Sequence, residues 1–575
     1  MKTTYSVMAY LRGIFYSLPV QLLFLHFRKY QVLLIFWFIL FSVVNGSFMK
    51  SFGADALFLA PEYIGNVNSL GLVIMGVCIG IYIMCWNVTT FILFSRHFTF
   101  LAATQFPFLK YCINNSVIPL SFLVFYLFKA YEFEHYKELV SNVEIIFLMG
   151  GFIAGILLIL SLSFIYFFRA DKTIFKKLQP VFNNAKNAIA HLQPENSTGR
   201  TLIRSEWFLD SFFRIRRCRD VSHYSPQLME KIFKRHHFAA VVSVLIAYLF
   251  LIFIGFFLDN KIFQLPAGAS ITLFFAILIG VSGALVYFFQ SWSVPAMIAF
   301  VLLLNFMYRI HWIDPHNKAY GLNYNTETLP EYSQQSLEAI SNTDSCRKDK
   351  QNMEHILNRW KQKQDNAKPL LVIMTTSGGG TRSATFTMNV LQKLDSITRG
   401  EIMKKTFLIT GASGGMIGAT FFRELYRERL KNPSMNLQSK QYINDIAEDL
   451  LNPTFTSFIA RDLFAPETKF KVGNYTYQRD RGYAFEKALN ENTRGVLNKR
   501  LLDYVPEESS ANIPLMFYHT VITRDGKMML LSTQHIRFMM QPPADSLDTT
   551  TTADAVDFTS FFAKQDPYNL RILTA

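Results

Sequence analysis

Two glycine-rich motifs in the last third of the chain carry residues that could perform acyl transfer. The second, Gly411 to Gly415, has the G-x-S-x-G pattern of a nucleophile elbow, where a sharp strand-to-helix turn presents a serine hydroxyl to substrate. This pattern makes Ser413 the expected nucleophile. The first motif, SGGGTRSA at Ser377 to Ala384, supplies consecutive backbone N–H groups, which can converge on the oxyanion formed when an ester carbonyl is attacked. The three candidate oxyanion-hole residues are Gly378, Gly379 and Gly380.

The sequence around each motif predicts the elements that position it. Leu370 to Met374 is a short apolar run before the first motif and predicts a buried parallel strand. Apolar residues at helical spacing follow that motif, so its loop should open into a helix whose N-terminus adds positive potential. Phe407 to Thr410 predicts the next strand, and Ile417, Phe421 and Leu425 predict a helix after Ser413. We therefore expect two consecutive strand-turn-helix units.

In this order the two motifs resemble those of the patatin-like phospholipases and their relatives, the cytosolic group IV phospholipases. Both families carry a G-G-G-x-R loop on one strand-helix turn and G-x-S-x-G on the next. The resemblance implies a patatin-like α/β domain with a central, mostly parallel sheet, and it covers about the last third of the chain. Ser377 and Ser383 depart from the usual patatin residues, Asp and Gly, toward the cytosolic phospholipase form. The resemblance also implies supporting positions at Arg382, Gly411, Gly414 and Gly415.

The same resemblance implies a Ser–Asp dyad, with the Asp in an Asp-Gly pair downstream of a strand hairpin. Asp525-Gly526 is the pair that follows Ser413, but its position between two apolar runs predicts a hairpin turn. Three later aspartates, Asp554, Asp557 and Asp566, lack a following glycine. We therefore expect the general base to be absent from this chain, through truncation of a longer protein or through loss.

Other kinds of chemistry have weaker support. Thr410 to Gly418 is similar to the glycine-rich start of short-chain dehydrogenases, and Tyr483-x-x-x-Lys487 has the form of their catalytic pair. The glycine spacing differs, however, and a nucleotide fold would leave the first motif unexplained. A triad would need His355, His519 or His535, which lack a supporting motif and which we interpret as ordinary domain residues. There is no metal-binding motif, so no metal and no cofactor are expected.

The first half of the chain predicts a multi-pass membrane region. Apolar residues make up 51% of the sequence, and runs of about 20 apolar residues can cross a bilayer as helices. The seven predicted spans are Gln31 to Phe48, Ser69 to Phe94, Cys112 to Phe128, Val143 to Phe168, Phe238 to Leu258, Ser270 to Phe289 and Ser293 to Tyr308. We expect an all-α transmembrane bundle in a bacterial cytoplasmic (inner) membrane.

Charge between the spans predicts their orientation. Basic residues at the N-terminus and in the loop from Ser95 to Tyr111 favour the cytoplasmic side, and seven crossings would place the α/β domain outside. The loop from Arg169 to His237 holds 14 Lys or Arg against 6 acids, interleaved with aromatic residues. We expect an amphipathic segment that binds anionic lipid headgroups here, in preference to nucleic acid. The net charge of +15 is thus attributed mainly to membrane topology.

These features predict four regions: a cytoplasmic segment at residues 1–30, a membrane region at 31–308 with its basic loop at 169–237, a polar linker at 309–366, and the hydrolase domain at 367–575. The expected function is a membrane-bound phospholipase A or lysophospholipase acting through Ser413. The alternatives are a catalytically decayed membrane scaffold or regulatory protein, a transporter with an appended regulatory domain, and a dehydrogenase-like nucleotide-binding domain.

Overall fold

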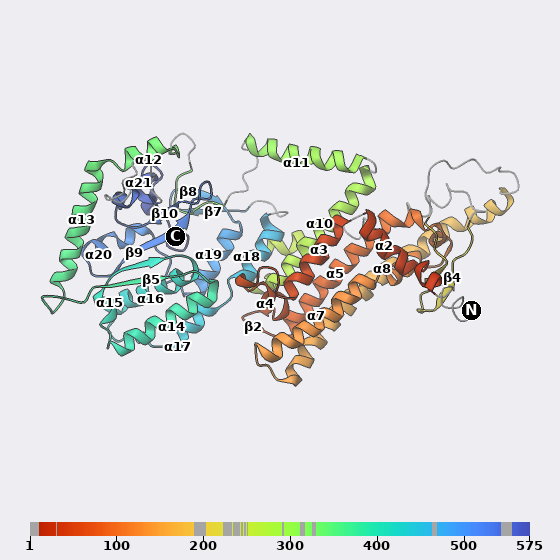
Figure 1. Cartoon of the computed structure of the whole chain (residues 1–575), viewed down its shortest axis with the longest axis horizontal. Coiled ribbons are helices and arrows are strands. Elements are labelled where there is room, and N and C mark those ends of the chain that lie inside the picture. The colour runs from red at the N-terminus through yellow and green to blue at the C-terminus, as the bar shows by residue number, and fades with distance from the viewer. Residues whose placement is uncertain are drawn as a thin grey trace. The chain divides into compact units, whose positions relative to one another are not determined.

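The chain folds into two compact units. The computed structural model describes residues 11–29, 31–188, 203–221, 233, 242, 245, 249, 251–289, 292–310, 317–324, 329–462, 468–541 and 555–575. The helical unit comprises Met1–Pro315 together with Phe455–Ala465, and the α/β unit comprises His316–Thr454 and Pro466–Ala575. Figure 1 shows both units with their elements labelled.

Long apolar helices form most of the described part of the helical unit. Its α-helices are α2 (Leu18–Lys29), α3 (Gln31–Val44), α4 (Ala54–Leu59), α5 (Ser69–Phe94), α6 (Pro107–Asn114), α7 (Val117–Tyr136), α8 (Asn142–Ala188), α10 (Ala267–Phe289) and α11 (Ser293–Arg309). Two short antiparallel hairpins accompany them: β1 (Glu62–Tyr63) with β2 (Asn66–Val67), and β3 (Trp207–Leu209) with β4 (Ile215–Arg217).

Three of these helices are long and apolar enough to cross a membrane. They are α5, the Asn142–Arg169 part of α8, and the Ala267–Leu285 part of α10. The number rises to five if each of two bent pairs, α2 with α3 and α6 with α7, forms one span. The helical class and the capacity to span a membrane, predicted from apolar runs, are therefore present.

The remaining predicted spans differ in detail from the observed helices. α3 ends at Val44 after 14 residues, because the chain turns through Gly46, whose φ is 70°. The predicted span from Cys112 to Phe128 is divided between α6 and α7 with a bend of 54°. α11 has 17 residues and falls among the shorter apolar helices. About half of the predicted span from Phe238 to Leu258 lies outside the described residues.

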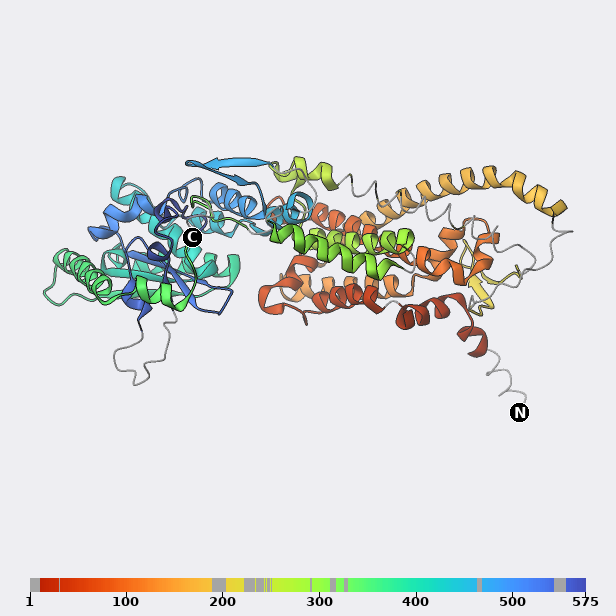
Figure 2. The same cartoon turned by 90° about the horizontal axis from the view of Figure 1, so that it is seen from above.

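The helix predicted to end at Phe168 continues without a break. α8 runs for 47 residues from Asn142 to Ala188 and is the long gold helix in Figure 2. Its N-terminal half packs closely on α5 through glycines. A Cβ at Gly76 would lie 2.1 Å from the carbonyl oxygen of Phe152, and one at Gly155 would lie 2.1 Å from that of Val73. Such small residues allow two helix backbones to approach one another, as is common in membranes.

A five-stranded sheet forms the centre of the α/β unit. Its strands are β5 (Val372–Thr376), β6 (Thr406–Gly411), β9 (Leu515–Val521), β10 (Met528–Leu531) and β11 (Ala555–Asp557), in the order β11-β10-β9-β6-β5. The pairs β5–β6, β6–β9 and β10–β11 are parallel, whereas β9 and β10 are antiparallel. The predicted α/β class and mostly parallel sheet are therefore present. A separate hairpin joins β7 (Lys469–Val472) to β8 (Tyr475–Gln478).

Helices pack on both faces of this sheet. α14 (Gly380–Ile397) and α16 (Ser413–Lys431) share one core with Ile409, Met516 and Tyr518 of the strands. Met353 of α13 (Thr343–Gln362) packs on the other face, against Phe517 and Leu530. The other helices of the unit are α12 (Gln334–Ile340), α15 (Ile402–Lys405), α17 (Lys440–Ala447), α19 (Arg481–Asn492), α20 (Val505–Ser509) and α21 (Phe558–Phe561), and α18 (Leu451–Ser457) crosses the unit boundary.

The segment predicted as a polar linker contributes to the α/β unit. This unit begins at His316, well before the predicted boundary at residue 367. α13 buries Cys346, Ile356 and Trp360, together with Asp349, along an otherwise exposed charged helix, so its polar composition reflects mainly its solvent-facing side.

Candidate active site

Both predicted strand-turn-helix units are present, and they lie side by side. β5 leads through Ser377 and the glycines into α14, and β6 leads through Ala412 into α16. Because β5 and β6 are parallel neighbours, their carboxyl ends meet at one edge of the sheet. The two glycine-rich motifs, which are more than 30 residues apart in the chain, therefore share one location.

Ser413 occupies a strained backbone position at the start of α16. Its φ is 57°, in the left-handed region that non-glycine residues enter at a cost of roughly 1–2 kcal/mol. The preceding Gly411 has a φ of 154°, and the N-cap, Ala412, is extended. A serine held in a strained strand-to-helix turn is the geometry of a nucleophile elbow. Strain of this kind persists where the surrounding structure fixes it.

Glycines allow the two motif loops to interlock. A Cβ at Gly414 would lie 1.9 Å from the carbonyl oxygen of Gly380, and one at Gly415 would lie 2.4 Å from that of Ser377. A Cβ at Gly411 would lie 2.2 Å from the carbonyl oxygen of Thr376. No other amino acid fits these positions without backbone movement. The glycines named as supporting the elbow thus act by permitting the close approach of the first loop.

The first loop places Gly378 next to Ser413. A Cβ at Gly378 would lie 3.1 Å from the Cβ of Ser413 and 3.4 Å from its Oγ. Gly379 and Gly380 have φ values of 151° and 62°, so this loop also needs glycine for its backbone conformation. The geometry therefore brings the predicted nucleophile and the predicted oxyanion loop together.

The electrostatic setting of this loop favours a negative charge. α14 and α16 both begin here, and neither N-cap residue, Gly379 or Ala412, accepts a side-chain hydrogen bond from its helix. Their first-turn N–H groups are therefore available, and each helix N-terminus carries partial positive charge. Arg382 is exposed, and across the described residues it makes no ion pair. An oxyanion or a phosphate would be stabilised at this position.

The Ser413 hydroxyl is exposed and has no hydrogen-bond partner in the described part of the chain. Asp525 lies in the tight turn between β9 and β10, as the hairpin prediction required, and accepts a 2.8 Å hydrogen bond from the Tyr332 hydroxyl. Asp557 ends β11 and accepts a 2.9 Å bond from the Thr559 hydroxyl. Asp554 lies outside the described residues. No described carboxylate thus contacts Ser413, and the general base remains unassigned.

Two of the three candidate histidines, His519 and His535, have other partners. His519, on β9, lies 2.6 Å (Nε2 to Oγ1) from Thr410 of the neighbouring β6, and burial lowers the pKa of its imidazole. His535 Nδ1 lies 2.9 Å from Ser560 Oγ beside Asp557. The Ser560 hydroxyl also donates a hydrogen bond directly to the Asp557 carboxylate. In a catalytic triad the carboxylate instead bonds to the histidine and orients its ring toward the serine, so His535, Ser560 and Asp557 do not have the arrangement of a triad.

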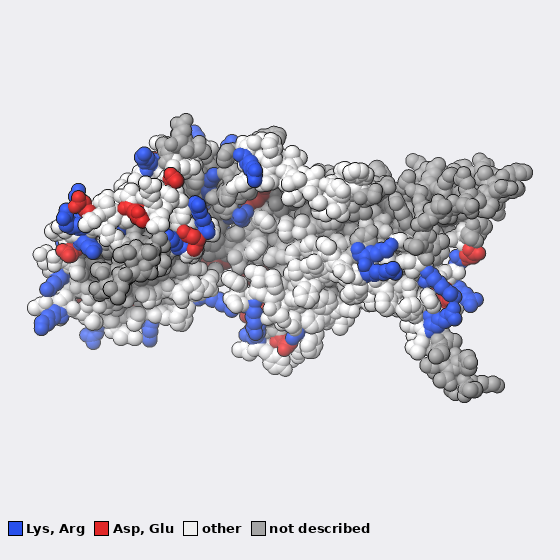
Figure 3. Space-filling model, turned by 45° about the horizontal axis from the view of Figure 1, so that its top comes forward, with Lys and Arg blue, Asp and Glu red and all other residues white. Residues whose placement is uncertain are grey.

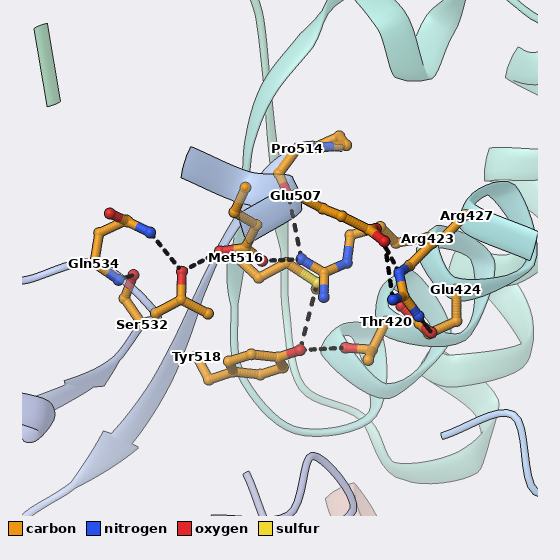
Figure 4. Close-up of polar contacts among 12 residues, drawn as sticks. Thr420, Arg423, Glu424, Arg427, Glu507, Pro514, Met516, Tyr518, Ser532 and Gln534 are labelled. Carbon is orange, nitrogen blue, oxygen red and sulfur yellow. Dashed lines mark hydrogen bonds and ion pairs between the residues drawn. The ribbon is translucent and has the colours of Figure 1, made fainter. Parts of the chain in front are cut away.

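α16 is fixed in place by buried charges that sequence reasoning did not identify. Arg423, ten residues beyond Ser413, is 1% exposed, pairs with Glu508 and donates a 3.1 Å hydrogen bond to the carbonyl of Pro514 (Figure 4). Arg427 donates to Glu507 over 3.0 Å. Both guanidinium groups also lie over the ring of Tyr504. The only sequence signal for this network is the appearance of Arg and Glu within a helix face that is otherwise apolar.

A cavity of about 430 Å³ opens elsewhere in the unit, at the other end of the sheet. Its walls include Thr406, the first residue of β6, and Leu515, the first residue of β9, whereas Ser413 follows the last residue of β6. This cavity therefore does not belong to the serine site. Across the described residues, no cluster of His, Cys, Asp or Glu is arranged to hold a metal ion.

Comparison of the chain with protein-family models, with curated proteins and with solved structures found no match. The functional assignment of this site therefore rests on its own geometry. That geometry combines a strained serine, a glycine loop beside it, two helix N-termini and an exposed arginine.

Proposed function

We propose that the α/β unit is a serine-dependent acyl-ester hydrolase of the patatin-like type, acting on phospholipid or lysophospholipid esters. The observation that carries this proposal is the position of Ser413, at a φ of 57° between a parallel strand and a helix, with Gly378 next to its side chain. Serine side chains in such turns are exposed for nucleophilic attack. Membrane-capable helices in the same chain favour a lipid as the source of the ester.

The reaction follows from these groups. The Ser413 oxygen attacks the ester carbonyl, its proton passes to a base, and the carbonyl oxygen becomes an anion. Backbone N–H groups of Gly378, Gly379 and Gly380, with the N-termini of α14 and α16, would stabilise that anion. Each such donor contributes about 3 kcal/mol. The tetrahedral intermediate then collapses and expels the alcohol, which is the lysolipid or the glycerol part of the substrate. This alcohol takes the proton back from the base. Water then attacks the acyl-serine, releases the fatty acid and returns the proton to Ser413.

Apolar side chains on the elements that flank the first loop suit an acyl substrate. Ile373 on β5 and Phe386 and Val390 on α14 are exposed. Arg382, with no ion pair to a described residue, would attract the lipid phosphate. A phospholipid presents both groups, an acyl chain and a phosphate, at fixed separation.

The helical unit would place this chemistry at a bilayer. We propose that the chain is a multi-pass membrane protein, on the support of three to five helices of sufficient length and apolarity. Its location in a bacterial cytoplasmic membrane stays a prediction. The outer side for the α/β unit also stays a prediction, from loop charge and seven crossings.

The test is fatty-acid release by the purified full chain from vesicles of labelled phospholipid and, separately, lysophospholipid. Ser413→Ala should lose all release above background, and Ser434→Ala, at an exposed surface serine, should retain it. Equal release by wild type and Ser413→Ala would refute the proposal.

One observation favours a second function, a catalytically decayed membrane scaffold or regulatory protein. Within the described residues the Ser413 hydroxyl has no base bonded to it. A folded wild-type protein that releases no acid from either lipid would support this alternative. The dehydrogenase-like alternative has less support, because Tyr483 packs on Phe470 and Lys487 lies 3.8 Å from Glu491 of the same helix.

A further inference from the structure

The basic loop predicted as an amphipathic segment contains a well-defined β-hairpin. β3 and β4 pair in register from Trp207 with Arg217 to Leu209 with Ile215. The Asp210 carboxylate organises the turn, since it accepts hydrogen bonds from the backbone N–H groups of Phe212 (2.9 Å) and Arg214 (3.0 Å). Its second oxygen accepts a 3.1 Å bond from Arg216 Nε. A single carboxylate thus holds the whole tip in one conformation.

β3 is attached along its whole length to the rest of the helical unit. The Asn114 side chain at the end of α6 donates to the carbonyl of Leu209 (2.8 Å) and accepts from its N–H (2.9 Å). Phe208 is buried against Phe100 at a ring distance of 5.3 Å. Ser17 forms a backbone bridge with Trp207. β3 is therefore held against the helical unit along its length, and the turn at residues 210–214 lies beyond these contacts.

The tip of the projection is apolar and exposed. Phe212 and Phe213 are 77% and 70% exposed, and the adjacent Ile215 is 71% exposed. Phe213 adopts a φ of 59°, a left-handed conformation that is costly for an aromatic residue. Because Asp210 fixes the turn, these rings cannot fold back to bury themselves. A rigid, exposed aromatic pair indicates a surface that is covered when the protein is in place.

Arginines lie both at the aromatic tip and at the base of the hairpin. Arg214 lies over the ring of Phe212 and Arg217 over that of Trp207. Arg219 follows at the base of β4. Within the described part of the chain none of these three forms an ion pair. In Figure 3 Lys and Arg side chains gather at the end of the helical unit where Figure 1 places β4.

We propose that this hairpin is a membrane-interface anchor that inserts Phe212 and Phe213 into the headgroup boundary of an anionic bilayer, with Arg214, Arg217 and Arg219 on the lipid phosphates. Aromatic rings favour the headgroup boundary, and one guanidinium group can donate two hydrogen bonds to the oxygens of one phosphate. Membrane-capable helices in the same unit place a bilayer within reach of the rigid hairpin. The proposal does not depend on catalysis by Ser413, and it goes beyond the predicted attraction of a basic loop to headgroups by naming the inserted residues.

The test uses spin labels on the full chain in vesicles. The background variant is Cys218→Ser, which removes the half-buried thiol close to the hairpin. One label is placed through Phe212→Cys and a control label through Ser434→Cys, at an exposed position of the α/β unit. Collisions with oxygen, which partitions into lipid, are compared with collisions with a water-soluble nickel chelate. The vesicles contain phosphatidylcholine alone or phosphatidylcholine with phosphatidylglycerol.

The proposal expects the hairpin label to lose nickel accessibility and gain oxygen accessibility in the anionic vesicles, while the control label stays accessible to nickel. Arg214→Gln, Arg217→Gln and Arg219→Gln together should restore nickel accessibility at the tip, and high salt should act in the same direction. A tip label that is as water-accessible as the control label in both vesicle types would overturn the proposal. Protection by a single-stranded oligonucleotide but not by vesicles would also overturn it and would assign the hairpin to nucleic acid.

Discussion

The carbonyl oxygen of Gly380 lies so close to Gly414 that a Cβ on residue 414 would sit 1.9 Å from it. Gly380 opens α14, and Gly414 follows Ser413, the first residue of α16. The contact therefore holds the first motif loop against the elbow, and it sets the position of Gly378 beside Ser413.

Replacing Gly414 by alanine should force these loops apart. We expect Gly414→Ala to destabilise the protein by about 1–3 kcal/mol or more, the usual scale of overpacking, and to reduce reaction of Ser413 with an active-site probe. The measurement is thermal unfolding together with probe labelling. Gly473→Ala is the control, because a Cβ there meets nothing within 4 Å, although its φ of 57° carries a cost of about 1 kcal/mol. Normal stability and labelling in Gly414→Ala would contradict the contact.

The ion pair between Arg423 and Glu508 should be costly to break. Both side chains are 1% exposed, so Glu508→Gln would leave a buried guanidinium without its counter-charge. We expect a loss of about 3–5 kcal/mol in the free energy of unfolding. Glu507→Gln should cost about 1 kcal/mol or less, because Glu507 is 29% exposed. Denaturant unfolding of both variants measures the difference, and similar losses would contradict the assignment of Arg423 as the buried anchor of α16.

Stability should decrease with rising pH through Glu486. Burial raises the pKa of this carboxyl from 4.5 to about 7, although the Thr574 hydroxyl and Arg571 favour its charged form. A carboxyl whose pKa is raised in the folded state contributes its full stabilisation at pH values below its unfolded-state pKa. This stabilisation is lost as the pH rises through the folded-state pKa. The loss between about pH 4.5 and about pH 7 is on the order of 3 kcal/mol.

Glu486→Gln should remove this dependence. The free energy of unfolding of the wild type relative to Glu486→Gln should therefore fall as the pH rises through this window. Denaturant titrations at several pH values provide the comparison. A constant difference across the window would show that Glu486 does not titrate with a raised pKa.

Asp525 should be dispensable for chemistry. It lies in the β9–β10 turn, where its carboxylate accepts bonds from Tyr332 and from the N–H of Lys527. We expect Asp525→Asn to keep the wild-type rate of acyl-ester hydrolysis and to change stability by about 1 kcal/mol or less. An Asp525→Asn protein that is folded but inactive would make this residue the missing general base.

The sequence predicted the parts of the fold that depend on local patterns. The turn residues Asp525-Gly526 predicted the β9–β10 hairpin, and the apolar run Leu370 to Met374 predicted β5. The prediction that this strand is buried was wrong, because β5 lies at the edge of the sheet and exposes Ile373. The G-x-S-x-G spacing predicted that Ser413 begins a helix directly after a strand, and its φ of 57° adds the strain typical of that turn. Long apolar runs likewise predicted α5, α8 and α10.

Other features could not be predicted because they depend on contacts distant in sequence. The pair of Arg423 with Glu508 spans 85 residues, and no local pattern records it. Asp210 fixes the turn of the β3–β4 hairpin, and Asn114 bonds to Leu209 beside that turn from 95 residues away, so composition alone suggested only a basic amphipathic segment. α3 was predicted too long because hydropathy continues past Val44, whereas the backbone turns at Gly46.

The most direct test of the central claim is labelling by a fluorophosphonate, which reacts covalently with activated serines. The full chain, Ser413→Ala and Ser434→Ala are treated in parallel, and the labelled peptide is identified by mass spectrometry. The account predicts that the wild type and Ser434→Ala are labelled on the peptide containing Ser413, and that Ser413→Ala is not labelled. A folded wild type that takes up no label, or equal labelling of Ser413→Ala, would contradict it.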